Sequence, residues 1–176
     1  MPDDSGAPAS ADDPFVLDTH AWLDLADNRG NRFHPTLRRR VELSASRGHV
    51  YIAAITVWEV AMLARRGELR LSLSTFEFVG TALRRTQTAI APLEPAIAVD
   101  SVELPDWDHK DPADRLIVAT ARYRGAILVT RDGDILDYAA DIGAVRAWQP
   151  SDPHPVKPRE KRDPRDEQKK RRRAKR

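Results

Sequence analysis

Four acidic side chains stand where they could share one piece of chemistry. Asp18 and Asp132 each end a short apolar segment, "FVLD" and "AILVTRD". Glu59 follows the apolar run "VYIAAI" by four residues, and Asp114 lies just before the apolar run of "HKDPADRLIVATA". Carboxylate oxygens are the ligands that hard divalent cations such as Mg²⁺ or Mn²⁺ prefer. If the fold brings these acids together, they predict a metal site.

The free-energy cost of gathering such acids supports a cation as their partner. Two carboxylates about 5 Å apart repel by roughly 3 kcal/mol at an effective dielectric constant of 20. Neighbouring apolar segments lower the dielectric constant and strengthen this repulsion, and a bound Mg²⁺ or Mn²⁺ would offset it. Without a metal, we expect a raised pKa for at least one of the acids.

Three of the acids also have a purely structural interpretation. Asp18 could cap a helix that begins near Thr19. Glu59 could complete a capping box with Thr56, three residues earlier. Asp132 and Gly133 together form a common turn pair. Each interpretation is reasonable for a single residue, whereas their joint position near strand ends favours a shared site.

The two aspartates of "HKDPADRLIVATA" have different expected roles. Asp111 stands directly before Pro112, and proline is favoured at the first position of a helix. Asp111 is therefore the expected N-cap of that helix. Asp114 lies in the first turn, where its charge interacts favourably with the helix dipole, and it is the member of the pair that joins the four acids.

Short apolar segments alternate with segments of helical spacing along the chain. We expect strands at 14–18, 50–55, 88–93, 126–132 and 145–148, and helices at 20–27, 36–48, 56–69, 74–87, 95–104 and 112–125. Continuously apolar strands separated by helices indicate an α/β fold with a mostly parallel sheet covered on both faces. Ligands bind such sheets beyond the carboxyl ends of the strands, which is where the four acids are expected.

Several other kinds of site and location are excluded by the composition. The chain of 176 residues has no cysteine, which excludes disulfides, zinc–thiolate sites and cysteine nucleophiles. The five histidines lack zinc-site spacing, and no nucleophile-elbow serine or glycine-rich phosphate loop is present. The acidic N-terminus lacks the apolar region of a signal peptide, and no apolar stretch is long enough to span a membrane. We expect a cytoplasmic protein with no membrane contact.

The charge is distributed unevenly between a central domain and its ends. Residues 151–176 hold 12 Lys/Arg and 5 Asp/Glu, which leaves 17 and 22 for residues 1–150. We expect a disordered segment at 1–13, a domain at 14–149, and a basic disordered tail at 150–176. The tail either contacts RNA or an acidic partner, or only increases solubility.

Four segments resemble, in order and spacing, the motif regions of PIN-domain ribonucleases, and in particular the VapC-type toxins of bacterial type II toxin–antitoxin modules. They are "FVLDTHAWL", "AAITVWEVAML", "HKDPADRLIVATA" and "ILVTRDGDI". The resemblance covers about residues 14–148 and leaves out both ends. It implies a Rossmann-like α/β/α sandwich and a metal-dependent endoribonuclease that acts on RNA with Mg²⁺ or Mn²⁺, is neutralised by a cognate antitoxin and forms a homodimer.

The same resemblance assigns roles to the acids. Asp18 and Asp114 would be the principal metal ligands, Glu59 would complete the acidic cluster, and Asp132 would be the fourth catalytic acid. The role of Asp134 stays open, because relatives differ in which aspartate of the last motif they retain. The alternatives are a structure-specific DNA nuclease and a non-catalytic RNA-binding or interaction protein that keeps the fold.

Side chains near the acids have weaker assignments. Arg115 and Arg131 either hold the phosphate backbone or pair with neighbouring acids, and for Arg115 we favour the pairing. His20 and His109 each lie beside a candidate ligand and could touch substrate. Trp58, beside Glu59, is expected in the core.

Overall fold

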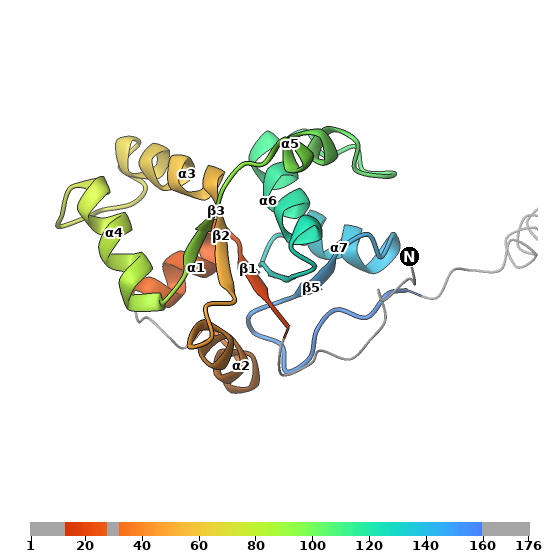
Figure 1. Ribbon diagram of the computed structural model, residues 1–176, viewed down its shortest axis with the longest axis horizontal. Helices are drawn as coiled ribbons and strands as arrows, with labels where there is room; N and C mark the ends of the chain where they lie inside the picture. Colours follow the sequence, from red (N-terminus) through yellow and green to blue (C-terminus); the bar gives the residue numbers. More distant parts are fainter. Residues whose placement is uncertain (1–12, 28–31, 160–176) are drawn as a thin grey trace, which may run out of the picture.

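The computed structural model describes residues 13–27 and 32–159, in which five strands form one parallel sheet. Its order is β3-β2-β1-β4-β5 (Figure 1). The strands are β1 (Phe15–Leu17), β2 (Val50–Ala53), β3 (Ala89–Ala91), β4 (Ile127–Val129) and β5 (Arg146–Trp148). The predicted α/β fold with a parallel sheet is confirmed.

Helices cover both faces of this sheet (Figure 1). They are α1 (Thr19–Ala26), α2 (Pro35–Ala45), α3 (Ala54–Arg65), α4 (Thr75–Thr86), α5 (Pro95–Val102), α6 (Pro112–Tyr123) and α7 (Gly133–Asp141). Successive strand residues point to opposite faces. Phe15 and Leu17 of β1 accordingly join a core with α1 to α4, whereas Val16 joins a second core with α6 and α7. The result is the α/β/α sandwich that the motif resemblance implied.

The strand order reverses direction beside β1. From β1 the chain proceeds outward to β2 and β3, and later returns to add β4 and β5 on the other side. In sheets of this kind the connections diverge at such a point and leave a crevice at the carboxyl ends of the two central strands. Asp18 directly follows β1 and Asp132 follows β4 by three residues. The topology therefore selects the acidic edge as the place for a ligand.

Helix α7 was not among the expected elements. The interpretation of Asp132 and Gly133 as a turn pair was wrong, because Asp132 is the N-cap of α7 and Gly133 is its first residue. Glycine has low helix propensity and so concealed the start of the helix. The buried residues Ile135 and Tyr138, three apart, supply the packing that stabilises it.

The alternative interpretation of Glu59 as a capping-box partner of Thr56 was also wrong. The strand β2 ends at Ala53, and α3 begins at Ala54 without a side-chain cap. Thr56 therefore lies inside the helix, and Glu59 lies in its second turn. The run "VYIAAI" has β-branched residues at both ends and therefore predicted a strand over its full length. Only its first four residues, which pack on both faces of the sheet, form β2.

The domain extends past the predicted boundary near residue 149. Val156 donates its amide to Ala147 O (2.8 Å), and Trp148 Nε1 donates to Asp152 O (3.0 Å). Arg159 pairs with Asp137 and Asp141 of α7. Residues 150–159, which we expected in the tail, thus lie along the domain, while the rest of the tail at 160–176 and the N-terminal residues 1–12 lie outside the described residues. Among the described helices, none has the length and apolar character of a membrane span.

Candidate active site

Asp18 is a helix cap and a member of the acidic site at once. It is the N-cap of α1, where its Oδ1 accepts from the Thr19 amide (2.6 Å). Its Oδ2 accepts from the Thr130 hydroxyl (2.7 Å), just beyond β4. The residue is only 6% exposed. These bonds fix the carboxylate between the ends of the two central strands, so the capping interpretation of Asp18 is confirmed, and the same residue lies where the shared site is predicted.

Glu59 joins the site through Thr19. The Thr19 hydroxyl donates to Glu59 Oε2 (2.6 Å), which ties the first turn of α1 to α3. Thr19 and Thr130 were not singled out from the sequence. The signal that could have found them is their position, since each is a hydroxyl residue within two residues of a central strand.

The two aspartates at the start of α6 make different contacts, and the expected N-cap role of Asp111 is confirmed. Asp111 Oδ1 accepts from the Ala113 amide (2.8 Å), so this residue is the N-cap. Asp114 makes a different contact, because its Oδ2 accepts from His109 Nε2 (2.6 Å). Its side chain is 20% exposed. Asp114 is therefore reachable from solvent and is held by a side chain rather than by backbone amides.

The two aspartates of the last motif occupy different places. Asp132 Oδ1 accepts from the Ile135 amide (3.0 Å), and the Asp132 amide donates to Thr130 Oγ1 (3.0 Å). Its charge raises the pKa of both Asp18 and Asp114. Asp134 is largely exposed and lies 3.5 Å from His109 Nδ1. Of the two, Asp132 thus belongs to the electrostatic cluster, and Asp134 lies on its rim.

Three of the acids have raised pKa values, as expected for a gathered cluster without a metal. Burial is the main cause for each. The pKa of Glu59 rises to about 7, with further increases from Asp18, Asp114 and Asp111, against the lowering effect of the Thr19 hydrogen bond. The pKa of Asp114 is raised by the charges of Asp111, Asp18 and Asp132, while the His109 hydrogen bond lowers it. The acids therefore lie within electrostatic reach of one another.

The donor chemistry of this cluster fits a hard divalent cation. All four predicted acids supply carboxylate oxygens, and a cation would relieve the repulsion that adds to the effect of burial on the pKa values of Asp18, Glu59 and Asp114. Within residues 13–27 and 32–159, however, no three acid or imidazole side chains are already arranged as a metal site. The structure shows a concentration of negative charge rather than a finished set of ligands.

The two arginines pair with groups other than the four acids. The expected pairing of Arg115 with neighbouring acids was wrong, because its guanidinium donates to backbone carbonyls, including those of Trp107 (2.9 Å) and His109 (3.0 Å). Arg131 pairs instead with Asp24 of α1, at 3.3 Å. The guanidinium has five N–H donors, and backbone carbonyls at the end of a helix and in the following loop satisfy them as well as a carboxylate does.

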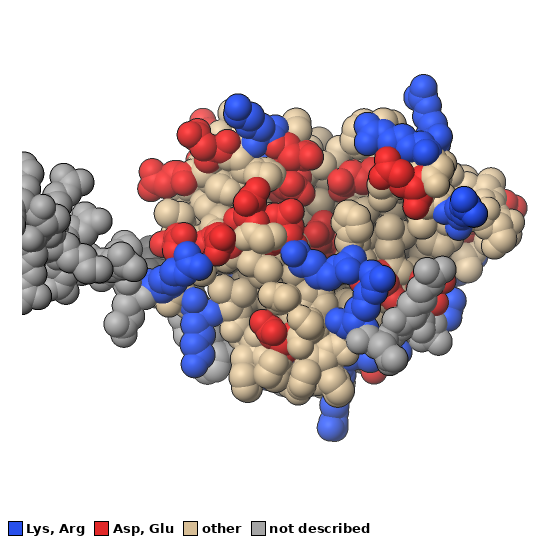
Figure 2. All heavy atoms as spheres, turned by 180° about the vertical axis from the view of Figure 1, so that it is seen from behind, with Lys and Arg blue, Asp and Glu red and all other residues tan. Residues whose placement is uncertain are grey.

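The surroundings of the site are acidic. Figure 2 shows Asp and Glu side chains gathered over one part of the rear face of the molecule. A groove of about 500 Å³ runs beside His109. Its acidic lining residues are Asp106, Asp108, Asp134, Asp137 and Asp141. A polyanion approaching this region meets repulsion unless cations are bound.

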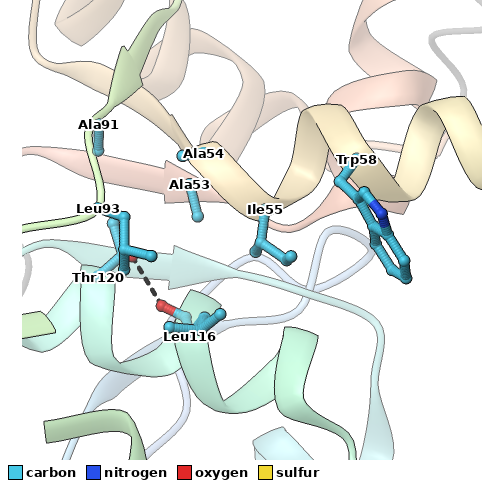
Figure 3. Close-up of a pocket in the computed structure, with 8 residues that line it drawn as sticks. All are labelled: Ala53, Ala54, Ile55, Trp58, Ala91, Leu93, Leu116 and Thr120. Atoms are coloured by element: carbon cyan, nitrogen blue, oxygen red, sulfur yellow. Dashed lines mark hydrogen bonds between the residues drawn. The ribbon is translucent and has the colours of Figure 1, made fainter. Parts of the chain in front are cut away.

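A second, apolar pocket of about 280 Å³ lies between α3 and α6 (Figure 3). It is lined by Ala53, Ala54, Ile55, Trp58, Ala91, Leu93, Leu116 and Thr120. The placement of Trp58 in the core was wrong, since the residue is 56% exposed. An apolar residue on a helix predicts burial only when its face of the helix meets the sheet, and Trp58 extends from α3 beside the pocket.

The pKa of Glu59 makes the metal-free protein sensitive to pH. Glu59 binds its proton more tightly in the folded chain than in the unfolded chain, where its pKa has the ordinary value of 4.5. Stability from this group is therefore present at low pH and lost as pH rises from 4.5 to about 7. We expect a loss of about 1 to 2 kcal/mol in the free energy of unfolding. This is less than the free energy that corresponds to the whole pKa shift, because solvent screens the half-buried group.

Urea unfolding at pH 5 and pH 7.5 in EDTA measures this effect. Glu59→Gln is expected to have a smaller pH dependence than the wild type, whereas Glu68→Gln, an exposed position in the loop after α3, is expected to match the wild type. An identical pH dependence in Glu59→Gln and wild type would contradict the assignment.

Comparison with known proteins agrees with this fold. The sequence pattern of the PIN domain family matches residues 15–141. The chain therefore belongs to the PIN domain family, and the motif resemblance is confirmed. It is 32% identical over 99 residues to Ribonuclease VapC22 of Mycobacterium tuberculosis (strain ATCC 25618 / H37Rv), a match that covers 53% of this chain and 75% of that protein.

Two crystal structures show the same fold. A chain of DNA-bound VapBC from Salmonella typhimurium matches with a TM-score of 0.54 and 20% identity, over 77% of this chain and 97% of that chain. A chain of VapBC2 from Rickettsia felis, bound to a DNA fragment from its promoter, matches with a TM-score of 0.56 and 16% identity, over the same shares. At these identities the likeness concerns the fold.

Proposed function

We propose that this protein is a metal-dependent endoribonuclease that serves as the toxin of a toxin–antitoxin module. The observation that carries the proposal is the placement of Asp18, Glu59 and Asp114, all with raised pKa values, around the crevice where the strand order reverses. The 32% identity to Ribonuclease VapC22 supports RNA as the substrate.

The cofactor of this activity is Mg²⁺ or Mn²⁺, held by Asp18 and Asp114 with Glu59 and Asp132 nearby. When bound, such an ion polarises a phosphoryl oxygen and lowers the pKa of an attacking water. The chain's own residues orient the carboxylates. Thr19 and Thr130 fix Asp18, the Thr19 hydroxyl also fixes Glu59, and the backbone of α7 fixes Asp132.

Cleavage assays with defined metals test the proposal. The full chain is incubated with single-stranded RNA in Mg²⁺, Mn²⁺ or EDTA, and in parallel with single-stranded and branched DNA. We expect RNA cleavage that requires a divalent cation. Cleavage that persists in EDTA overturns the metal role, preferential cleavage of branched DNA favours a structure-specific nuclease, and RNA binding without cleavage in any metal favours a non-catalytic protein.

The proposed protein partner is a cognate antitoxin. Support comes from the identity to Ribonuclease VapC22 and from the fold shared with the VapBC structures. Expression of the chain alone is expected to arrest growth, and co-expression of its antitoxin is expected to restore growth. Growth arrest that is unchanged by Asp114→Ala would separate toxicity from the acidic site.

A homodimer is the assembly we propose for the chain itself. Trp58 and Leu93, both more than half exposed, flank the apolar pocket of Figure 3, and exposed apolar surface of this kind marks protein interfaces. Trp58→Lys is expected to convert a dimer to a monomer in size-exclusion chromatography with light scattering. Leu43→Lys, on α2 at the opposite end of the sheet, serves as control. A monomeric wild type, or a dimeric Trp58→Lys, would contradict this assembly.

A further inference from the structure

The loop between α5 and α6 is tied down by Arg115. This side chain donates to the carbonyls of Ser101 (2.6 Å), Val102 (2.9 Å), Trp107 (2.9 Å) and His109 (3.0 Å). Arg115 directly follows Asp114 in α6. The same turn of helix that carries a candidate metal ligand therefore also fixes the loop that carries His109.

Aromatic stacking holds the His109 ring in place. Its ring lies parallel to that of Trp107, with centroids 4.7 Å apart and planes within 9°. Trp107 stacks in turn on Tyr138 of α7, at 4.6 Å and 18°. Tyr138 is almost fully buried. The imidazole thus stands at the end of a three-ring stack anchored in the core, which restricts its rotation far more than an exposed loop would.

The stack directs His109 at Asp114. His109 Nε2 lies 2.6 Å from Asp114 Oδ2, and both side chains are at most one-fifth exposed. The other ring nitrogen faces Asp134, at 3.5 Å. Among the described residues, His109 is the side chain whose hydrogen bond acts on the pKa of Asp114.

A competing conformation of Asp114 explains why such a bond matters. With Asp111 as N-cap and Pro112 as the first helical residue, Asp114 stands at the third helical position. A glutamate or glutamine at this position turns back to accept from the backbone amide of the N-cap residue in a capping box. In α4 of this chain Glu77 does so with Ser74. Asp114 instead accepts from His109.

We propose that His109 is a positioning residue that holds the Asp114 carboxylate at the crevice and so sets the affinity of the site for a divalent cation. This inference rests on the proposed metal-dependent function. Partners that hydrogen-bond a ligating side chain typically change metal affinity or activity by about 10- to 100-fold when they are removed. Arg115, Trp107 and Tyr138 act through His109, because they fix the loop and the ring.

Two substitutions separate the hydrogen bond from the stacking. His109→Phe keeps an aromatic ring on Trp107 but removes the donor, whereas His109→Gln removes the ring but keeps an N–H donor at a similar reach. Mn²⁺ binding to the full chain is measured by isothermal titration calorimetry, with Asp114→Asn as the loss-of-ligand reference and exposed His154→Ala as the control. We expect binding weakened about 10- to 100-fold in His109→Phe, with partial recovery in His109→Gln.

The outcomes distinguish this inference from the function on which it rests. Absence of Mn²⁺ binding by the wild type overturns the proposed function and this inference with it. Wild-type affinity in His109→Phe overturns this inference alone, as does a larger loss in His109→Gln than in His109→Phe, because that order indicates a role of the ring in stacking only.

A measurement on the unmodified protein covers the case in which His109→Phe does not fold. The imidazole nitrogens of His109 are observed by ¹⁵N NMR during a Mg²⁺ titration, with the resonances assigned through His109→Gln. A ring bonded to a ligating carboxylate is expected to shift on binding, while the exposed His154 ring is not. An unchanged His109 resonance at saturating Mg²⁺ overturns the inference.

Discussion

Asp18→Asn is expected to reduce RNA cleavage by about 100- to 1000-fold while leaving the metal-free domain at least as stable as the wild type. The loss of activity follows from the loss of a charged ligand at the centre of the crevice. The gain or retention of stability follows from burial. Asp18 is 6% exposed, and desolvation raises its pKa, so its charge destabilises the folded chain.

The asparagine can keep the local hydrogen bonds. Its carbonyl oxygen still accepts from the Thr19 amide, and its amide group donates to the Thr130 hydroxyl oxygen, which previously donated to Oδ2. Thermal unfolding in EDTA and single-turnover RNA cleavage in Mn²⁺ measure the two effects, with the exposed Asp152→Asn as control. Wild-type cleavage by Asp18→Asn would remove this residue from the mechanism, and a strongly lowered melting temperature would show that its charge is structural.

This opposition between stability and activity accounts for the pattern of burial around the site. A chain selected only for stability would place neutral caps at the ends of β1 and β4, because Ser, Thr and Asn satisfy helix amides without a charge to desolvate. Instead Asp18 and Asp132 cap α1 and α7 and raise the pKa values of their neighbours. Destabilising groups retained at one edge of a sheet are typical of functional sites.

The acids themselves were predictable from the sequence because their positions follow from topology. Apolar strands separated by helices predict a parallel sheet, and the carboxyl ends of such strands meet at one edge. Asp18 and Asp132 follow their strands directly enough for this rule to place them. Asp111 was predictable from Pro112 alone, since the pair specifies a helix start.

The partners of the acids were not predictable, because they depend on contacts between distant segments. Thr130 is 112 residues from Asp18, and Thr19 is 40 residues from Glu59. The spacing of "HKDPADRL" does not indicate that Arg115 donates to backbone carbonyls instead of pairing with the acids beside it. The exposure of Trp58 was not predictable either, because helical spacing identifies an apolar face of a helix but not which face meets the sheet.

Asp114→Asn and Asp111→Asn are expected to differ sharply in their effect on cleavage although the residues are three apart. Asp114→Asn removes the charge held by His109 at the crevice, and we expect RNA cleavage to fall by about 100-fold or more and growth arrest to disappear. Asp111→Asn keeps an oxygen that accepts from the Ala113 amide, so the helix cap survives. It also removes one charge that raises the pKa values of Glu59 and Asp114, and cleavage is expected to stay within a few-fold of wild type.

Asp111→Ala completes this comparison, because it removes the cap as well as the charge. It is expected to lower the free energy of unfolding by about 1 kcal/mol, as loss of an N-cap usually does, without abolishing cleavage. Cleavage rates in Mn²⁺ and urea unfolding of the three variants decide the matter. Retained activity in Asp114→Asn together with lost activity in Asp111→Asn would exchange the two roles, and would mean that the carboxylate nearest the proline, rather than the one held by His109, serves the metal.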